Sequence, residues 1–170
     1  MPDLHILIFT VIGLALVFDF INGFHDTANA IATSVSTRAI SPRDAILMAA
    51  ILNFLGAMYS TGVAKTIGAD IVRSAGHVNE HVLIAALSGA VIWNILTWWA
   101  ALPSSSSHAL VGGVIGAVLV STGLEGLNLW GIGKIILSLV ASPVLAIVSG
   151  CLVMRGLYML FGRCTPYNIN

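Results

Sequence analysis

Long apolar runs alternate with short polar stretches along this chain. Four runs of about twenty residues contain no Asp, Glu, Lys or Arg. These runs are Ala45–Ala64, Val82–Leu102, Ser104–Gly123 and Ile135–Met154. A fifth run, Leu4–Phe24, is interrupted only by Asp19 and Asn22. A helix of about 20 residues spans the ~30 Å hydrocarbon core of a bilayer, so the pattern predicts an all-α integral membrane protein with about five hydrophobic segments.

The composition supports this fold class. The chain has 170 residues, of which 58% are hydrophobic and only 8% are charged, whereas soluble domains carry roughly a quarter charged residues. The formal net charge is zero and basic residues do not cluster, which argues against nucleic-acid binding. Cys151 and Cys164 lack the spacing of a metal site. We expect residues 1–170 to form a single membrane domain without a metal or bound cofactor.

Polar residues in and just after the first run recur at helical spacing. Asp19, Asn22, Asp26, Asn29 and Thr33 are spaced 3, 4, 3 and 4 residues apart. At about 100° per residue they share a wedge about 80° wide, and His25 lies outside it. An acid at the bilayer centre costs ~2.5–3.5 kcal/mol. We therefore expect the wedge to face protein or trapped water; packing through neutral acids is the alternative.

The continuity of this helix is an open question. Gly23 stands in the middle of the stretch. A helix break there would free backbone groups that only protein or water satisfies, and transporters place substrates and ions at such discontinuous helices.

Two later runs carry stripes of small residues with one amide each. The stripes are Ala49, Asn53, Gly56 and Ser60, and Ala90, Asn94, Thr97 and Ala101. Such stripes suit close helix packing in membranes. Together with the acidic wedge, they would enclose a polar cavity.

The stretch 103-PSSSSH-108 predicts a helix start. Pro103 does not continue a helix from the preceding run, and serines are favoured helix N-caps. The unpaired N–H groups and partial positive charge of a helix N-terminus suit phosphate or sulfate. Two alternatives remain open: an ordinary capped turn, and a segment Ser104–Gly123 that enters the membrane and returns as a hairpin.

The two stretches NGFHDTANAIAT and LPSSSSHALVGGVIG together resemble motifs of the inorganic phosphate transporter (PiT) family. The resemblance covers about Val11 to Gly162, and the flanking segments are similar to those of the bacterial low-affinity members. It implies phosphate uptake across the bacterial cytoplasmic (inner) membrane by symport with H+ or Na+, with phosphate entering free or as a divalent-metal complex. His25 replaces an Asn of the family motif, which favours proton coupling because imidazole changes charge near neutral pH.

The resemblance and the wedge together assign candidate site residues. The candidate substrate-binding residues are Asn22, Asp26, Asn29, Ser105, Ser106 and Ser107. The candidate coupling-ion or proton residues are Asp19, Asp26, His25 and His108.

The PiT family is built from two inverted repeats, each with a copy of the motif. This sequence contains one copy, so it resembles one half of such a transporter, and the expected partners are phosphate, membrane lipid and a second half or another copy of the chain. The alternatives are transport of sulfate or another oxyanion, a fragment that does not transport, and an intramembrane serine hydrolase.

Overall fold

The computed structural model describes residues 2–59, 70–73 and 78–162, which are predominantly helical. The elements are α1 (Pro2–Ser36), α2 (Pro42–Tyr59), α4 (Glu80–Trp99), α5 (Ser106–Thr122), the 3-10 helix η2 (Gly123–Gly126) and α6 (Leu129–Phe161). Four helical stretches are long and apolar enough to cross a bilayer: Leu4–Ser36, Glu80–Trp99, Ser106–Gly126 and Leu129–Phe161. The prediction of an all-α integral membrane protein is confirmed.

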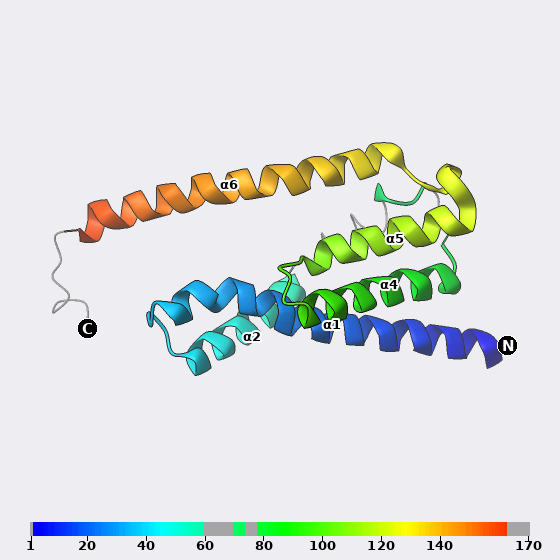
Figure 1. The fold of residues 1–170 in the computed structure, drawn as a ribbon, viewed down its shortest axis with the longest axis horizontal. Helices are drawn as coiled ribbons and strands as arrows, with labels where there is room; N and C mark the ends of the chain where they lie inside the picture. Colours follow the sequence, from blue (N-terminus) through cyan, green and yellow to red (C-terminus); the bar gives the residue numbers. More distant parts are fainter. Residues whose placement is uncertain (1, 60–69, 74–77, 163–170) are drawn as a thin grey trace. The chain divides into compact units, whose positions relative to one another are not determined.

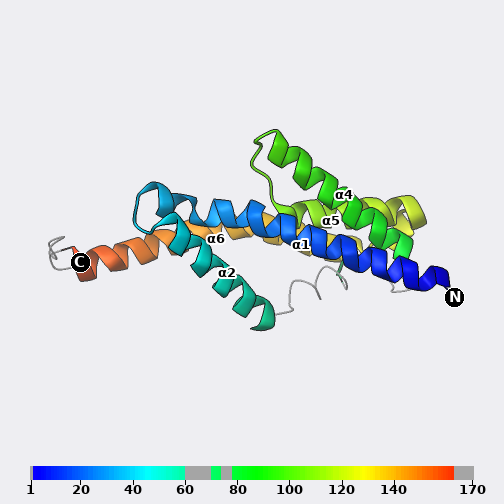
Figure 2. The ribbon, with the colours of Figure 1, turned by 90° about the horizontal axis from the view of Figure 1, so that it is seen from below.

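The chain divides into two units, Met1–Leu129 and Trp130–Asn170. Within the first unit, α4 packs against both α1 and α5; the helices run along one another in Figure 1, and Figure 2 shows α4 crossing the other two obliquely. Helix α2 folds back beside the second half of α1. Outside the helices, Val72 forms an isolated antiparallel bridge with Leu127.

Helix α1 is continuous through Gly23, so the break considered from the sequence does not occur. A glycine inside a helix costs only about 0.5–1 kcal/mol relative to alanine. A break at this depth in an apolar segment would instead leave backbone N–H and C=O groups without partners, at several kcal/mol each. The continuous helix is therefore the cheaper solution.

The later runs also form uninterrupted helices. The serine-led segment is a single α-helix, Ser106–Thr122, and does not return as a hairpin within that length. The run Ala45–Ala64 corresponds to α2 as far as Tyr59; its remaining residues, including Ser60, lie outside the described part of the chain, as does Cys164. In the second unit, Ile135–Met154 falls inside the longer α6, which accommodates Pro143.

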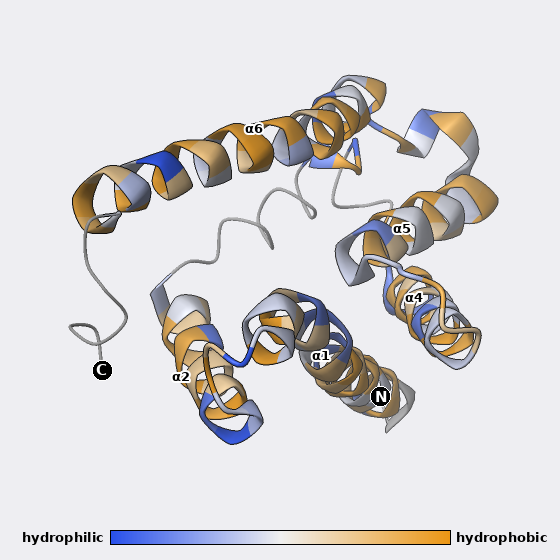
Figure 3. Cartoon of the chain, turned by 60° about the vertical axis from the view of Figure 1, so that its left-hand side comes forward, coloured by the Kyte–Doolittle hydropathy of each residue, from blue (hydrophilic) through white to orange (hydrophobic). Residues whose placement is uncertain are grey.

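Side chains from three helices form the core of the first unit. Phe18 and Ile21 of α1 meet Ala90 and Val91 of α4, with Leu87, Ala109 and Leu110 packed against them. Most other large apolar side chains of the described residues are exposed, and hydrophobic colour runs along most of each helix (Figure 3). Such a surface suits hydrocarbon and apolar partners rather than water.

A glycine sets the spacing between α4 and α5. A Cβ atom added at Gly113 would collide with the carbonyl oxygen of Ala86, whereas one added at Gly112 would meet nothing within 4 Å. Small residues let helix backbones approach closely in a membrane, where van der Waals contact drives association. Gly113 therefore permits the contact that holds α5 against α4.

We predict that Gly113→Ala destabilises the first unit by about 1–3 kcal/mol, the usual cost of forcing extra volume into a packed contact. Gly112→Ala is the matched control, since it adds the same methyl group to open space one residue away. Thermal unfolding of both variants in detergent checks this. Equal melting temperatures for the two variants would contradict the close-contact role of Gly113.

Candidate functional site

The serine run lies at a turn that the end of α4 defines. Leu102 N–H donates to Thr97 O at 2.8 Å and Ala101 N–H donates to Trp98 O at 3.1 Å, with Ala101 in the left-handed region at φ 53°. This pattern is a Schellman motif, which closes a helix C-terminus. The following Pro103 prevents the helix from resuming, so the chain reverses here and enters α5.

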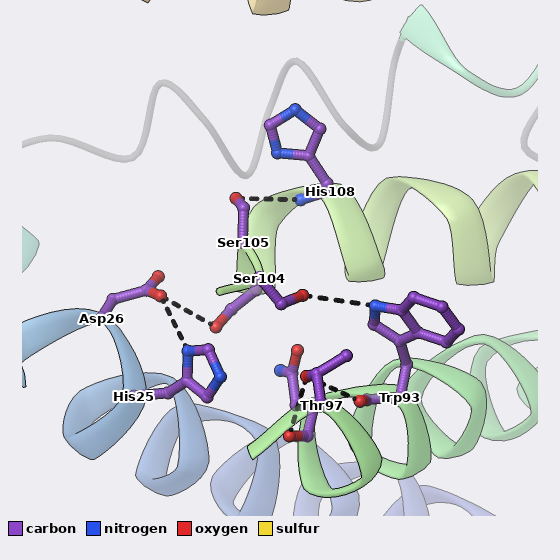
Figure 4. A network of polar contacts seen from close by, with 9 residues as sticks. His25, Asp26, Trp93, Thr97, Ser104, Ser105 and His108 are labelled. Atoms are coloured by element: carbon purple, nitrogen blue, oxygen red, sulfur yellow. Dashed lines mark hydrogen bonds and ion pairs between the residues drawn. The ribbon is translucent and has the colours of Figure 1, made fainter. Parts of the chain in front are cut away.

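The predicted helix start at the serines is confirmed. Ser105 is the N-cap of α5, and its hydroxyl accepts a hydrogen bond from His108 N–H at 3.4 Å. The hydroxyl of Ser104 accepts a bond from Trp93 Nε1 at 3.3 Å, which ties the turn back to α4 (Figure 4). The end of α5 that carries unpaired N–H groups and partial positive charge is thereby held in one place.

Ser106 connects this turn to α1. Its hydroxyl donates to Asp26 Oδ1 at 3.3 Å, across 80 positions of sequence. The Ser106 side chain is fully buried, while that of Asp26 is 42% exposed. The structure thus brings together the acid of the first motif and a serine of the second, as the sequence analysis required.

His25 stands beside the same carboxylate. Its Nδ1 atom lies 3.5 Å from Asp26 Oδ1, and its side chain is buried. Among the described residues this nitrogen has no hydrogen-bond partner. Figure 4 shows His25 and Asp26 projecting from α1 toward the serine turn. An imidazole, a carboxylate and a hydroxyl therefore follow one another from α1 to α5.

The predicted polar wedge is not the buried face of α1. Asp19 and Asn29 are exposed, and Asn22 is half-buried. The face that packs on α4 instead carries Phe18, Ile21 and His25, spaced 3 and 4 residues apart. Burying apolar side chains is favourable, whereas burying a row of acids and amides is costly unless each finds a partner. His25, which the wedge left out, is consequently buried more deeply than any residue of the wedge.

A cleft opens next to His25. It has a volume of about 290 Å³, and its polar lining comes from His25, Asn29 and Thr97. The remaining lining residues are Phe24, Ala28, Trp98, Ala101, Leu102 and Pro103. The Thr97 hydroxyl already donates to Trp93 O at 2.9 Å and Asn94 O at 3.1 Å. Asn29 therefore shares a cleft with His25, which contacts the Asp26 carboxylate.

Other candidate residues lie farther from the carboxylate–serine contact. Ser107 and His108 are exposed on the first turn of α5, where His108 and Trp93 line a separate cleft of about 420 Å³. Asp19 is nearly two turns before Asp26 on α1. The structure does not bring these residues into the contact that joins Asp26 to Ser106.

Sequence reasoning expected the stripe on α4 to help enclose a polar cavity but assigned no residue of α4 to the site. Trp93 positions the serine turn, and Asn94 is fully buried with neither amide atom hydrogen-bonded within the described part of the chain. The stripe Ala90, Asn94, Thr97 and Ala101 was available as a signal, but its small residues favoured a packing interpretation. The amide at its centre was the informative feature.

The arrangement bears on metal binding and on hydrolysis. Among the described residues, no three His, Cys, Asp or Glu side chains gather as a metal-binding group; the Asp26 carboxylate and neighbouring hydroxyls are oxygen donors of the kind hard cations use. A serine hydrolase needs its nucleophile bonded to a base. Here Ser106 donates to a carboxylate and the imidazole contacts that carboxylate, so the geometry does not favour the hydrolase alternative.

Comparison with known proteins places this geometry in a family. The model of the phosphate transporter family matches residues 22–168, a stretch that contains both motifs. The chain belongs to the phosphate transporter family.

Several curated relatives in the phosphate transporter family are similar to the chain. A Bacillus subtilis (strain 168) protein named "Probable low-affinity inorganic phosphate transporter" is 51% identical over 162 residues, which cover 95% of this chain and 49% of that protein. A protein of the same name from Streptomyces halstedii is 44% identical over 94% of this chain and 75% of its own length. "Low-affinity inorganic phosphate transporter PitB" of Escherichia coli (strain K12) is 35% identical over 93% of this chain and 33% of its own length.

A solved structure has a similar fold. The structure titled "The sodium-dependent phosphate transporter" superimposes with a TM-score of 0.81 at 35% identity, covering 91% of this chain and 40% of that one. The chain spans about half the length of the Bacillus relative and a smaller share of several other matched proteins. This coverage is consistent with one half of a transporter.

We predict that Asp26 and Ser106 are energetically coupled. A double-mutant cycle with Asp26→Ala and Ser106→Ala should give a coupling of about 0.5–1.5 kcal/mol, because each variant removes the same hydrogen bond. The measurement is chemical unfolding in detergent. Ser105→Ala is the matched control, since its hydroxyl accepts from His108 N–H. Strict additivity of Asp26→Ala and Ser106→Ala would refute the contact.

Proposed function

We propose that this chain is one half of a secondary transporter that moves inorganic phosphate across the bacterial cytoplasmic membrane by cation-coupled symport. The observation that carries the proposal is the contact between Asp26 of α1 and the fully buried Ser106 at the N-terminus of α5. Membership of the phosphate transporter family and the printed names of the relatives support phosphate as the substrate. Sulfate is the second candidate, because it shares the tetrahedral geometry.

The N-terminus of α5 supplies the attraction for the anion. The first N–H groups of a helix lack intrahelical partners, and together they carry roughly half a positive charge. The hydroxyl groups of Ser105 and Ser107 add donors next to those groups, and the Ser106 hydroxyl would add a third on turning from Asp26 to the anion. A phosphate bound here would take hydrogen bonds from the backbone and from the serines, as anions do at helix N-termini elsewhere.

The carboxylate explains why transport would be coupled. Asp26 is hydrogen-bonded to the serine at which the anion would bind, and two negative charges this close repel each other strongly where little water screens them. A sodium ion or a proton that enters with phosphate removes this repulsion. His25, beside the same carboxylate, offers a second place for a proton. Phosphate carried as a divalent-metal complex would answer the same electrostatic demand.

The described half leaves the site open. Asn29 and Ser107 are exposed and Asp26 is 42% exposed, although the bilayer provides no hydrogen bonds for such groups. A second transporter half, or another copy of this chain, would cover them and complete the pocket at the interface between halves, where repeat-built transporters bind their substrates.

We predict that Asp26→Asn abolishes phosphate uptake while leaving expression and folding nearly unchanged, because it removes the charge and keeps the shape. Uptake of radiolabelled phosphate into proteoliposomes measures this, with the chain alone and with the part of the Bacillus relative that it does not cover. Asp44→Asn is the control: Asp44 is exposed at the start of α2 and accepts a bond from Ser41. Wild-type uptake by Asp26→Asn, or no uptake by wild type in either format, would refute the proposal.

We also predict that uptake requires a cation gradient. With a sodium gradient, a proton gradient or neither imposed across the vesicles, accumulation of phosphate above its external concentration should be lost when both gradients are absent, because symport then has no driving force. Equal accumulation under all three conditions would argue against symport.

A further inference from the structure

Asn94 carries a buried amide that helix packing alone does not explain. Its side chain is fully buried in α4, and neither its Nδ2 nor its Oδ1 atom has a hydrogen-bond partner within the described part of the chain. Leaving both ends of a buried amide unpaired is costly, and buried polar groups in native proteins are nearly always paired. Because both atoms lack partners, the choice of amide orientation does not affect this conclusion.

The position of Asn94 on α4 places it between the core and the candidate site. One turn earlier, Ala90 and Val91 pack on Phe18 and Ile21 of α1. One turn later, Thr97 lines the cleft that His25 also lines. The preceding residue, Trp93, donates to the serine turn through its indole N–H. Asn94 therefore lies on the α4 segment that holds the serine turn and borders the site.

We propose that Asn94 is a specificity-determining residue that binds the transported oxyanion in its protonated form and so selects phosphate over sulfate. This inference rests on the phosphate transport proposed above. On binding, the amide Nδ2 donates to a phosphate oxygen, and Oδ1 accepts a hydrogen bond from a phosphate hydroxyl. Because the amide is buried in the described form, this requires the junction of α1, α4 and α5 to open toward the serine turn.

The discrimination follows from the protonation of the two anions. Near neutral pH, inorganic phosphate carries at least one P–OH group, whereas sulfate carries none. Sulfate would satisfy Nδ2 and leave Oδ1 facing another oxygen without a proton between them. A site built to hydrogen-bond a substrate hydroxyl rejects an analogue that lacks it, because a buried group is then left unpaired. Asp26 also offers acceptor oxygens, but it already accepts from Ser106 and is partly exposed, so its discrimination would be weaker.

A packing role for Asn94 predicts a different outcome. If the amide only filled space, replacing it would change anion affinity only as far as it changed stability. If the amide serves the substrate, replacing it lowers the selectivity for phosphate whether or not stability changes. The two roles therefore differ in whether selectivity changes independently of the melting temperature.

The test uses Asn94→Leu, which keeps approximate volume without polar atoms, and Asn94→Ser. The serine variant guards against misfolding, because its hydroxyl can donate to the carbonyl four residues earlier, as Thr97 does to Trp93. Asn53→Leu makes the same chemical change at an exposed amide of α2, in a cleft shared with Phe20 and Thr27. The assay is uptake of radiolabelled phosphate by the chain with its complementing half, in competition with unlabelled phosphate or sulfate.

We expect both Asn94 variants to lose about tenfold or more in apparent phosphate affinity, with little change in inhibition by sulfate, and we expect Asn94→Leu to show no fall in melting temperature. Asn53→Leu should retain wild-type selectivity. Unchanged selectivity in both Asn94 variants, or a loss that tracks reduced melting temperature, would overturn the inference while phosphate transport stands. Absence of uptake by the wild-type assembly would instead remove the proposed function, and the inference with it.

Discussion

A hydrogen bond between a serine and a carboxylate joins two distant segments of this chain inside an apolar bundle. Ser106 is buried completely, and Asp26 is the acid that meets it. In a medium without water, burying a polar side chain is costly unless another polar group satisfies it. This constraint relates the position of α5 to that of α1 and fixes where any anion bound at the start of α5 would lie.

The rest of the first unit supports that contact. Gly113 lets α5 approach α4 closely, and the Schellman motif at Thr97–Leu102 reverses the chain so that α5 begins beside the end of α4. Trp93 then ties the serine turn to α4. Each device sets one degree of freedom of the turn: the distance between helices, the direction of the chain or the orientation of the loop. The serines are consequently presented by rigid elements, as a selective site requires.

The sequence predicted the helices of this fold better than it predicted which face of each helix packs against a neighbour. Runs without charge gave the helical segments, and Pro103 with its serines gave the start of α5, because both signals are local. The wedge of Asp19, Asp26 and Asn29 was a correct set of angles on a helix, but angles within one helix do not say which side meets its neighbour. That choice depended on Phe18, Ile21 and the small residues of α4. Apolar residues of these kinds occur in every hydrophobic segment, so the sequence does not show which of them meet a neighbouring helix.

The same reasoning explains why the polar wedge left out His25, which became a candidate only through the family motif, and why Asn94 was not among the candidates. Each is a lone polar residue on a face that packs, and from sequence alone such residues are more often packing elements than ligands. What distinguishes them is the unpaired atom that remains after the chain has folded, a property that exists only in three dimensions. The Nδ1 atom of His25 lies beside the Asp26 carboxylate, and Asn94 follows Trp93, whose indole holds the serine turn. These atoms without a hydrogen bond indicate that the folded state retains binding capacity that its own side chains do not use. Of the four buried polar side chains among the described residues, Thr97 and Ser106 are hydrogen-bonded, whereas His25 and Asn94 keep atoms without a hydrogen bond. This arrangement is better suited to receiving a small polar ligand than to packing alone.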